Sequence, residues 1–252
     1  MGIYAMTGGA TGIGAAIKEQ VRARGDQMIV VDIRDADVVA DLSTPEGRAA
    51  AIAGILERTP EGLDGFVACA GLGPNNSPAL VARVNYFGAV ELLEGLRDAL
   101  ARRRGAAVII SSNSAPMSTD ADYVATLLAG DEQGAVSHLE GKDGQTAYSG
   151  SKLAVARWVR RNAAAWAAQG VRMNAVAPGY ITTPLSQAAA ADPRYADAMK
   201  AFVDSIPVGR AGEPEDIANV VSFLLTPAAS FICGSVLFVD GGHDAMFRPD
   251  QF

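Results

Sequence analysis

The chain has 252 residues, 49% hydrophobic and 19% charged, a balance typical of a globular protein that buries about three quarters of its unfolded surface. Its formal net charge of -7 disfavours nucleic acid and anionic membranes as partners. The sequence has no apolar run of about 20 residues and no basic leader before its first strand-like segment, so we expect a single cytoplasmic domain over residues 1–252.

Short β-branched runs alternate with alanine-rich stretches along most of the chain. Strands are predicted at 3–6, 28–33, 64–70, 106–111, 171–177 and 236–242. Helices are predicted after Gly14, from Pro45, at about 80–103, after Tyr148, and near 195–204 and 214–225. This βαβ alternation, with strands that are apolar almost throughout, predicts a Rossmann-like, doubly wound parallel sheet with helices on both faces.

Two stretches interrupt this alternation. Residues 115–146 are acidic and rich in glycine, and they contain one short amphipathic segment, YVATLLAG. Residues 184–206 follow a PGYITTP turn and are interpreted as a helical flap. Connections of this length inside a compact domain are usually functional or disordered.

A glycine-rich segment, TGGATGIG, lies between the first predicted strand and the first helix. Gly8, Gly12 and Gly14 would let the backbone approach a pyrophosphate at a helix N-terminus, although glycines here can also simply form the turn. Asp32 ends the second predicted strand, where its carboxylate can accept hydrogen bonds from an adenosine ribose and repel a 2'-phosphate. We therefore predict NAD as the cofactor. Arg34 is the one residue that favours NADP, because its side chain could turn toward a 2'-phosphate.

Asp41 and Leu42 follow the VVA run that comes after the second predicted strand. One interpretation places them against the adenine of the cofactor. The other is that Asp41 only caps the next turn, and the sequence favours neither.

Tyr148 and Lys152 are four residues apart, which places them on one face of a helix if the run that follows is helical. The ammonium could then lower the pKa of the phenol and make Tyr148 a proton acceptor for alcohol oxidation. Ser112 ends an apolar run that predicts a strand, so its hydroxyl could bind the same substrate oxygen. A serine, tyrosine or lysine in such a position has, by itself, more often a structural than a catalytic role. The catalytic interpretation rests on the order of the three residues and on the glycine-rich segment that precedes them.

Cys69 and Cys233 are the only cysteines, and we expect buried free thiols and no metal site. We interpret the arginines at 102–104 as the last turn of a helix, where their positive charges interact favourably with the helix dipole.

Ordered motifs extend from one end of the chain to the other: TGGATGIG (7–14), CAGLG (69–73), VNYFG (84–88), ISSNS (110–114), YSGSK (148–152), VAPGYITTP (176–184) and FVDGG (238–242). Together they resemble the short-chain dehydrogenase/reductase family. The resemblance implies a sheet of seven strands, a homodimer or homotetramer, and NAD bound as cofactor.

The resemblance also implies functional residues. The catalytic tetrad corresponds to Asn85, Ser112, Tyr148 and Lys152, with Asn85 holding a water that links Lys152 to solvent. The cofactor contacts correspond to Gly8, Thr11, Gly12, Ile13, Gly14, Asp32, Ile33, Asp41, Leu42, Ala70, Gly71, Tyr148, Lys152, Pro178, Gly179, Ile181 and Thr183.

Two features depart from the family pattern. The family's NNAG segment is here Ala68-Cys69-Ala70-Gly71, which removes the side chains expected to stabilise the central strand. Ser112 and Tyr148 are 36 residues apart, more than the usual gap in the family, so 115–146 resembles an insertion beside the active site. Its apolar residues could wall a substrate cleft or pack an oligomer interface.

The expected activity is the interconversion of a secondary alcohol and a ketone with NAD. The insertion, the segments ADLSTPEGR, VNYFGA and TPAAS, and the C-terminal DGGHDAMFRPDQF resemble those of family members that act on 3α-hydroxysteroids and bulky carbonyl compounds. A general carbonyl reductase or small-alcohol dehydrogenase is the alternative within enzymes. A non-catalytic NAD-binding protein is the alternative outside them.

Overall fold

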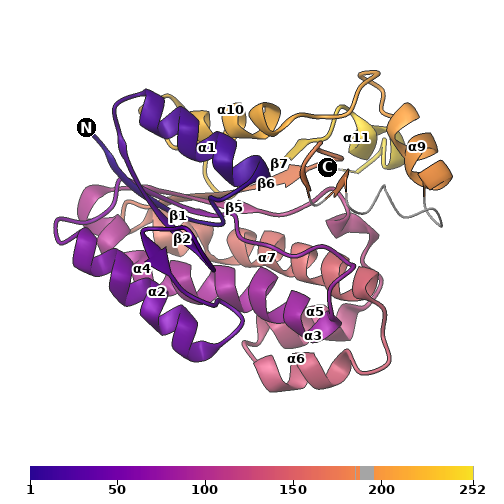
Figure 1. Ribbon diagram of the computed structural model, residues 1–252, viewed down its shortest axis with the longest axis horizontal. Helices are drawn as coiled ribbons and strands as arrows, with labels where there is room; N and C mark the ends of the chain where they lie inside the picture. The colour runs from indigo at the N-terminus through magenta and orange to yellow at the C-terminus, as the bar shows by residue number, and fades with distance from the viewer. Residues whose placement is uncertain (185, 188–195, 252) are drawn as a thin grey trace.

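The computed structural model describes residues 1–184, 186–187 and 196–251. A seven-stranded sheet forms its centre, with the order β3-β2-β1-β4-β5-β6-β7 and every neighbouring pair parallel (Figure 1). The strands are β1 (Ile3–Thr7), β2 (Gln27–Asp32), β3 (Val38–Val39), β4 (Gly65–Ala68), β5 (Ala106–Ile110), β6 (Arg172–Pro178) and β7 (Val236–Val239). The predicted doubly wound α/β class is confirmed.

Helices cover both faces of this sheet (Figure 1). One face carries α1 (Gly12–Ala23) and α10 (Pro214–Leu224), which pack against each other. The other carries α2 (Pro45–Arg58), α4 (Gly88–Arg103) and α7 (Gly144–Ala167). Along β5, Ala107 and Ile109 join the core under α2, α4 and α7, while Val108 and Ile110 join the core under α1 and α10. This alternation explains why the strands are apolar at nearly every position.

The insertion is mostly helical and lies outside the α7 layer (Figure 1). It contains the 3-10 turn η2 (Ala115–Met117) and the helices α5 (Ala121–Leu128) and α6 (Glu132–His138). α5 contacts α7, and α6 contacts α3 (Pro78–Ala82). A single π-helical turn, η1 (Arg83–Phe87), joins α3 to α4.

The chain ends with several short elements. They are α9 (Ala196–Asp204), the 3-10 turn η3 (Pro227–Ala229) and α11 (His243–Phe247). Of the predicted flap at 184–206, residues 185 and 188–195 lie outside the described part of the chain. Within the described ranges, no helix is both long enough and apolar enough to cross a bilayer.

Several boundaries differ from the prediction. α1 begins at Gly12 and not after Gly14, and α7 begins four residues before Tyr148. β3, α6 and α11 were not predicted, because each is too short to show a periodic apolar pattern.

Candidate active site

The glycine-rich segment joins β1 to α1 at the point where the strand order reverses. Gly8 has a φ of +75°, and a Cβ there would lie 2.7 Å from the backbone of Ala70, which follows β4. A Cβ on Gly14 would lie 1.7 Å from the carbonyl oxygen of Gly8. These glycines therefore hold the loop tightly folded at the carboxyl ends of β1 and β4, where open α/β sheets bind ligands. Thr11 is the exposed N-cap of α1, and Ile13 packs partly against the core.

Asp32 lies at the carboxyl end of β2 beside the same loop. Its carboxylate accepts hydrogen bonds from the backbone N–H of Ala10 at 3.1 Å and of Ile33 at 2.8 Å. The Ile33 side chain is 65% exposed next to it. An anionic acceptor is thus fixed against the glycine loop, which suits recognition of two ribose hydroxyls.

Thr7, which the sequence analysis did not single out, stabilises the segment where the family's asparagines are missing. Its buried hydroxyl accepts hydrogen bonds from the backbone N–H groups of Cys69 and Ala70, at 3.2 and 3.1 Å. The side chain lost at the end of β4 is therefore compensated from β1. The only sequence signal was a threonine directly before the glycine loop.

Asn85 lies in the π-helical turn and is almost fully buried. Its side-chain oxygen accepts a hydrogen bond from the N–H of Leu72 at 2.8 Å, and its Nδ2 donates to the carbonyl of Leu72 at 3.0 Å. A Cβ on Gly71 would lie 3.4 Å from Asn85 Oδ1 and 3.5 Å from Lys152 Nζ. The loop after β4 thus brings Gly71, Asn85 and Lys152 to one place.

Ser112, Tyr148 and Lys152 converge as predicted in space. Lys152 Nζ donates to the carbonyl of Ile110, the last residue of β5, at 2.9 Å and lies 5.8 Å from the ring centroid of Tyr148. The backbone carbonyl of Lys152 accepts from Ser111 Oγ at 2.8 Å, so α7 is tied to β5 immediately before Ser112. The phenol, the hydroxyl and the ammonium therefore lie together beside the carboxyl end of β5.

Burial dominates the pKa values of Tyr148 and Lys152 in this structure, and no lowering of the Tyr148 pKa by Lys152 is resolved. Burial raises the pKa of Tyr148 above its ordinary value, and the nearby Ser112 side chain opposes the rise. Burial also lowers the pKa of Lys152 to about 8, which a nearby Cys69 thiol opposes. Both shifts follow from the cost of placing a charge away from water.

The loop after β6 borders the glycine loop. A Cβ on Gly12 would lie 3.2 Å from Thr183 Cγ2, and Thr183 receives a hydrogen bond from Ser186 N–H at 3.2 Å. Pro178 ends β6, and Gly179 packs so closely on Asp240 that a Cβ would lie 2.6 Å from that side chain. Ile181 is buried and pairs with Gly212. All four predicted positions lie, like the glycine loop, at the carboxyl ends of the strands.

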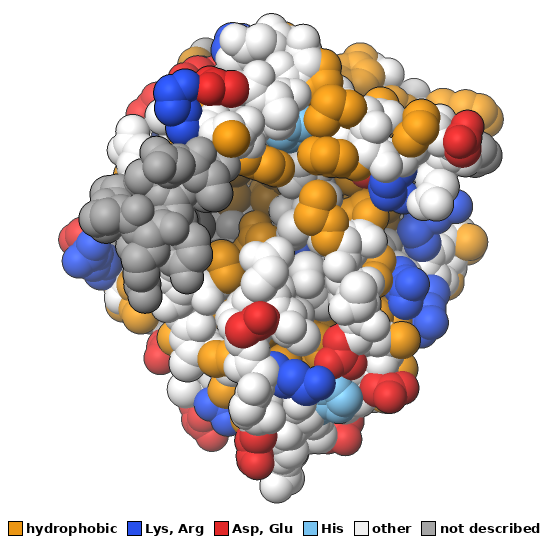
Figure 2. All heavy atoms as spheres, turned by 90° about the vertical axis from the view of Figure 1, so that its right-hand side faces the viewer, with side chains coloured by type: hydrophobic (Ala, Val, Ile, Leu, Met, Phe, Trp, Pro, Cys, Tyr) orange, Lys and Arg blue, Asp and Glu red, His pale blue; other side chains and the backbone are white. Residues whose placement is uncertain are grey.

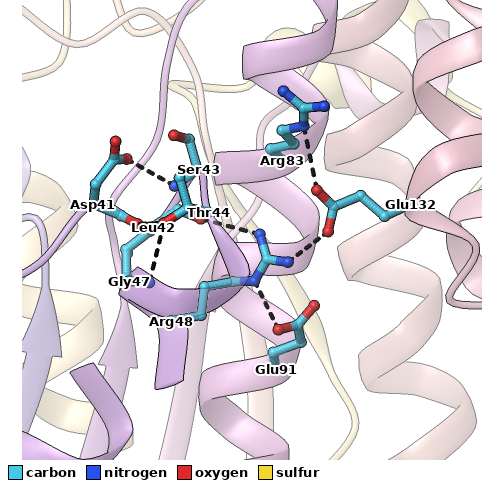
Figure 3. Close-up of polar contacts among 9 residues, drawn as sticks. All are labelled: Asp41, Leu42, Ser43, Thr44, Gly47, Arg48, Arg83, Glu91 and Glu132. Carbon is cyan, nitrogen blue, oxygen red and sulfur yellow. Dashed lines mark hydrogen bonds and ion pairs between the residues drawn. The ribbon is translucent and has the colours of Figure 1, made fainter. Parts of the chain in front are cut away.

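Asp41 and Leu42 lie before α2, beside a buried charge network (Figure 3). Asp41 Oδ1 accepts from the N–H of Ser43 at 2.9 Å, and the Ser43 side chain together with this N–H lowers the pKa of Asp41. The carboxylate thus takes part in a local turn, as one of the two interpretations expected. Leu42 is buried, and its carbonyl accepts from Arg48 Nη1 at 3.3 Å.

Arg48 connects this segment to the insertion (Figure 3). Its guanidinium is almost fully buried and donates to Glu91 on α4 at 2.7 Å and to Glu132 on α6 at 2.5 Å. Glu132 also pairs with Arg83 at 3.2 Å. Two arginines and two carboxylates thus neutralise one another and hold α6 against α2 and α4.

The predicted apolar segment of the insertion does not face an open cleft. Tyr123, Val124 and Leu127 of α5 are fully buried in the core that includes α7. A Cβ on Gly150 would lie 2.5 Å from Tyr123 Cδ1, so the tyrosine ring occupies the space that this glycine leaves on α7. α5 therefore supports the helix that carries Tyr148 and Lys152.

The molecular face toward which the strands' carboxyl ends point is hollowed and bordered by hydrophobic side chains (Figure 2). Exposed apolar residues on elements at this edge are Met117 after β5, Val208 beside Gly241, and Met246 and Phe247 on α11. The predicted buried thiols are only partly correct, because Cys69 is partly buried and Cys233 is exposed. The glycine loop, the hydroxyl of Ser112, the phenol of Tyr148 and the ammonium of Lys152 thus lie at the face of the molecule that carries this hollow.

Comparison with known proteins agrees with this geometry. A family model described as enoyl-(acyl carrier protein) reductase matches residues 134–244. The chain is 48% identical over 259 residues to a 3-alpha-hydroxysteroid dehydrogenase/carbonyl reductase of Comamonas testosteroni, with all of both chains covered. It is 31% identical to a cis-4-hydroxycyclohexanecarboxylate dehydrogenase of Sinomonas cyclohexanicum, with 97% of each covered.

A solved structure is equally similar. The 3-alpha-hydroxysteroid dehydrogenase from Pseudomonas sp. B-0831, complexed with NADH, superposes with a TM-score of 0.95 at 49% identity. The superposition covers 99% of this chain and all of that one.

Proposed function

Because the chain belongs to the short-chain dehydrogenase/reductase family, we propose that it interconverts 3α-hydroxysteroids, or similarly bulky apolar secondary alcohols, and their ketones with NAD. The protein is an oxidoreductase, and the substrate and the residue roles are the proposal. Its main support is the convergence of Ser112, Tyr148 and Lys152 at the end of β5, beside the glycine loop. The names of the two relatives at nearly half identity support the substrate class.

The residues at the sheet edge fit a dinucleotide. Gly8 and Gly14 keep the loop free of side chains where a pyrophosphate would approach, and Thr183 lies against Gly12. Bound NAD would supply the hydride acceptor and a positive charge close to Tyr148. Lys152 would hold the ribose, since its Nζ lies 3.5 Å from the position that a Cβ on the exposed Gly71 would occupy.

The protein's own groups then handle the proton. In oxidation, Ser112 donates a hydrogen bond to the alcohol oxygen, and the Tyr148 phenolate accepts the hydroxyl proton. In reduction, both hydroxyls donate to the carbonyl oxygen, and Tyr148 transfers its proton as charge develops there. Because burial raises the pKa of Tyr148, the phenolate needs cationic neighbours, and oxidation should become faster as the pH rises.

Replacement of Tyr148 by Phe tests this chemistry. We expect turnover to fall by about a hundredfold or more, while NADH binding measured by fluorescence stays near wild type. Tyr4→Phe is the matched control, because it removes a phenol hydroxyl near the amino end of β1, away from the carboxyl ends of the strands where the site lies. Substantial turnover by the Tyr148→Phe variant contradicts the proposed acid–base role.

A panel of alcohols tests the substrate class. NADH absorbance is followed with a 3α-hydroxysteroid, a cyclohexanol and an aryl ketone at neutral and alkaline pH. Turnover of the steroid supports the proposal. Turnover of small cyclic alcohols alone favours the second candidate, which the similarity to the cis-4-hydroxycyclohexanecarboxylate dehydrogenase supports. Binding of NADH without any turnover indicates a non-catalytic protein.

We propose NAD rather than NADP because of Asp32. At about 4 Å, a carboxylate and a 2'-phosphate repel by about 1 kcal/mol in water and about 4 kcal/mol at an intermediate dielectric. Asp32→Ala should therefore reduce the preference for NAD over NADP, measured as kcat/KM with NAD divided by kcat/KM with NADP. Asp35→Asn, a charge change on the adjacent exposed turn, is the control. Equal use of both cofactors by the wild type contradicts the assignment.

We further propose that the enzyme works in the cytoplasm as a homo-oligomer. Two free thiols suit a reducing compartment. Phe231 is fully exposed and Phe223 is 43% exposed, which are surfaces that an assembly could bury. Size-exclusion chromatography with light scattering tests the oligomeric part, and a monomer at micromolar concentration contradicts it.

A further inference from the structure

The hydroxyl of Ser112 receives two hydrogen bonds from one neighbouring residue. The backbone N–H of Ser114 lies 3.1 Å from Ser112 Oγ, and Ser114 Oγ lies 3.0 Å from the same atom. A serine hydroxyl has two acceptor positions and a single proton to donate. With both acceptor positions filled, Ser112 can act only as a donor.

The Ser112 hydroxyl lies beside the phenol of Tyr148. Ser112 is almost fully buried, and its side chain opposes the rise that burial causes in the pKa of Tyr148. A neighbour lowers the pKa of a phenol when it donates a hydrogen bond to the charged form, because that bond stabilises the phenolate.

We propose that Ser114 is a positioning residue for the reaction: by filling both acceptor positions of Ser112, it fixes that hydroxyl as a donor, whose single proton goes to Tyr148 before a substrate binds and to the substrate oxygen afterwards. The inference rests on the proposed function and deepens it. It explains why the substrate proton must pass to Tyr148, since a Ser112 that cannot accept leaves no second route. Donation from Ser114 also polarises the Ser112 hydroxyl and strengthens the bond that it donates.

The side chain of Ser114 is not needed to hold the local backbone. The turn after β5 is closed by a hydrogen bond from Ala115 N–H to the carbonyl of Ser112 at 3.1 Å. Asn113 N–H donates to the carbonyl of Pro178 at 2.9 Å, which fixes the turn to β6. Ser114 precedes η2 without making a side-chain capping bond. Removal of its hydroxyl should therefore leave the turn folded.

The test compares Ser114→Ala with Ser114→Thr, which keeps a hydroxyl. Ser118→Ala, a hydroxyl deletion four residues further on, is the matched control. Protein labelled with ¹³C at the tyrosine ζ carbon is titrated by NMR with NAD bound, and the Tyr148→Phe variant identifies the resonance. Oxidation of a 3α-hydroxysteroid at constant pH is measured in parallel.

In Ser114→Ala we expect the pKa of Tyr148 to rise and turnover to fall by about three- to tenfold, the effect of one neutral hydrogen bond, with the KM for NAD unchanged. Ser114→Thr and Ser118→Ala should resemble the wild type in both measurements. An unchanged pKa of Tyr148 in Ser114→Ala overturns the inference. Failure of the wild type to oxidise any alcohol would overturn the proposed function instead, and the NMR titration would still report on Ser114.

Discussion

Lys152 is a charged group held almost entirely away from water, so the apoprotein should become more stable when that charge is removed. Burial lowers its pKa from an ordinary 10.5 to about 8. At about 1.4 kcal/mol for each pH unit, this displacement corresponds to a cost of about 3 kcal/mol for keeping the ammonium charged at neutral pH.

The substitution Lys152→Met removes the charge and keeps a side chain of similar length. It also removes the hydrogen bond to the carbonyl of Ile110, and a buried carbonyl without its partner costs about 1–2 kcal/mol. The difference predicts a net gain of about 1–2 kcal/mol in the free energy of unfolding at pH 7. Catalysis and ribose binding should be lost in the same variant.

The pH dependence gives the sharper test. Between pH 8 and 10.5 the unfolded chain binds the Lys152 proton and the folded chain does not, so this group makes wild-type stability rise with pH across that window. Below about pH 8 the cost is fully present, and above 10.5 it is gone. The advantage of Lys152→Met should therefore disappear as the pH rises from 8 to 10.5.

Urea denaturation of the wild-type and Lys152→Met apoproteins measures the difference in their free energies of unfolding at pH 7 and at pH 10.5. Lys142→Met is the control, because Lys142 is half-exposed and should change stability by less than about 0.5 kcal/mol at either pH. A Lys152→Met variant that is less stable than wild type at pH 7, or an advantage that persists at pH 10.5, would refute the reasoning.

Three further substitutions test the close packing around the site. Gly14→Ala places a Cβ 1.7 Å from the carbonyl oxygen of Gly8, so it should cost about 1–3 kcal/mol in urea denaturation and weaken NADH binding measured by fluorescence. Gly150→Ala places a Cβ 2.5 Å from the Tyr123 ring, so it should lower the free energy of unfolding, and by less when Tyr123 is also replaced by Leu. If the two substitutions lower the free energy of unfolding additively, the contact does not exist. Thr7→Val should lose about 1–3 kcal/mol through two unsatisfied amides, whereas Thr7→Ser should retain most of the stability; equal losses would contradict the hydroxyl's role.

The sequence predicted the longer elements well, because their apolar periodicity is local information. The six predicted strands all exist, and their alternating contributions to two cores account for their continuous hydrophobicity. β3 escaped prediction because only Val38 and Val39 pair with β2. α6 escaped because it is short and polar, although Asp131 caps it by accepting from Gly134 N–H.

The motifs located the candidate catalytic side chains, whereas their electrostatics required coordinates. Tyr148 and Lys152 were expected to stabilise a phenolate between them, but burial shifts both pKa values toward the neutral forms. Desolvation depends on every atom packed around a group, and no spacing in a sequence records it. The same limit explains why Cys233 was expected inside and lies exposed.

The insertion shows what an amphipathic pattern can and cannot predict. The apolar face of α5 indicated burial, but not the surface that buries it. In the structure, Tyr123 fills the space above Gly150, midway between Tyr148 and Lys152 on α7. A residue buried there cannot also contact a substrate, so we expect α5 to affect catalysis only through α7, which it supports. We expect substrate preference to change instead by substitution of exposed apolar residues around the hollow, such as Met117 near the start of the insertion and Phe247 on α11.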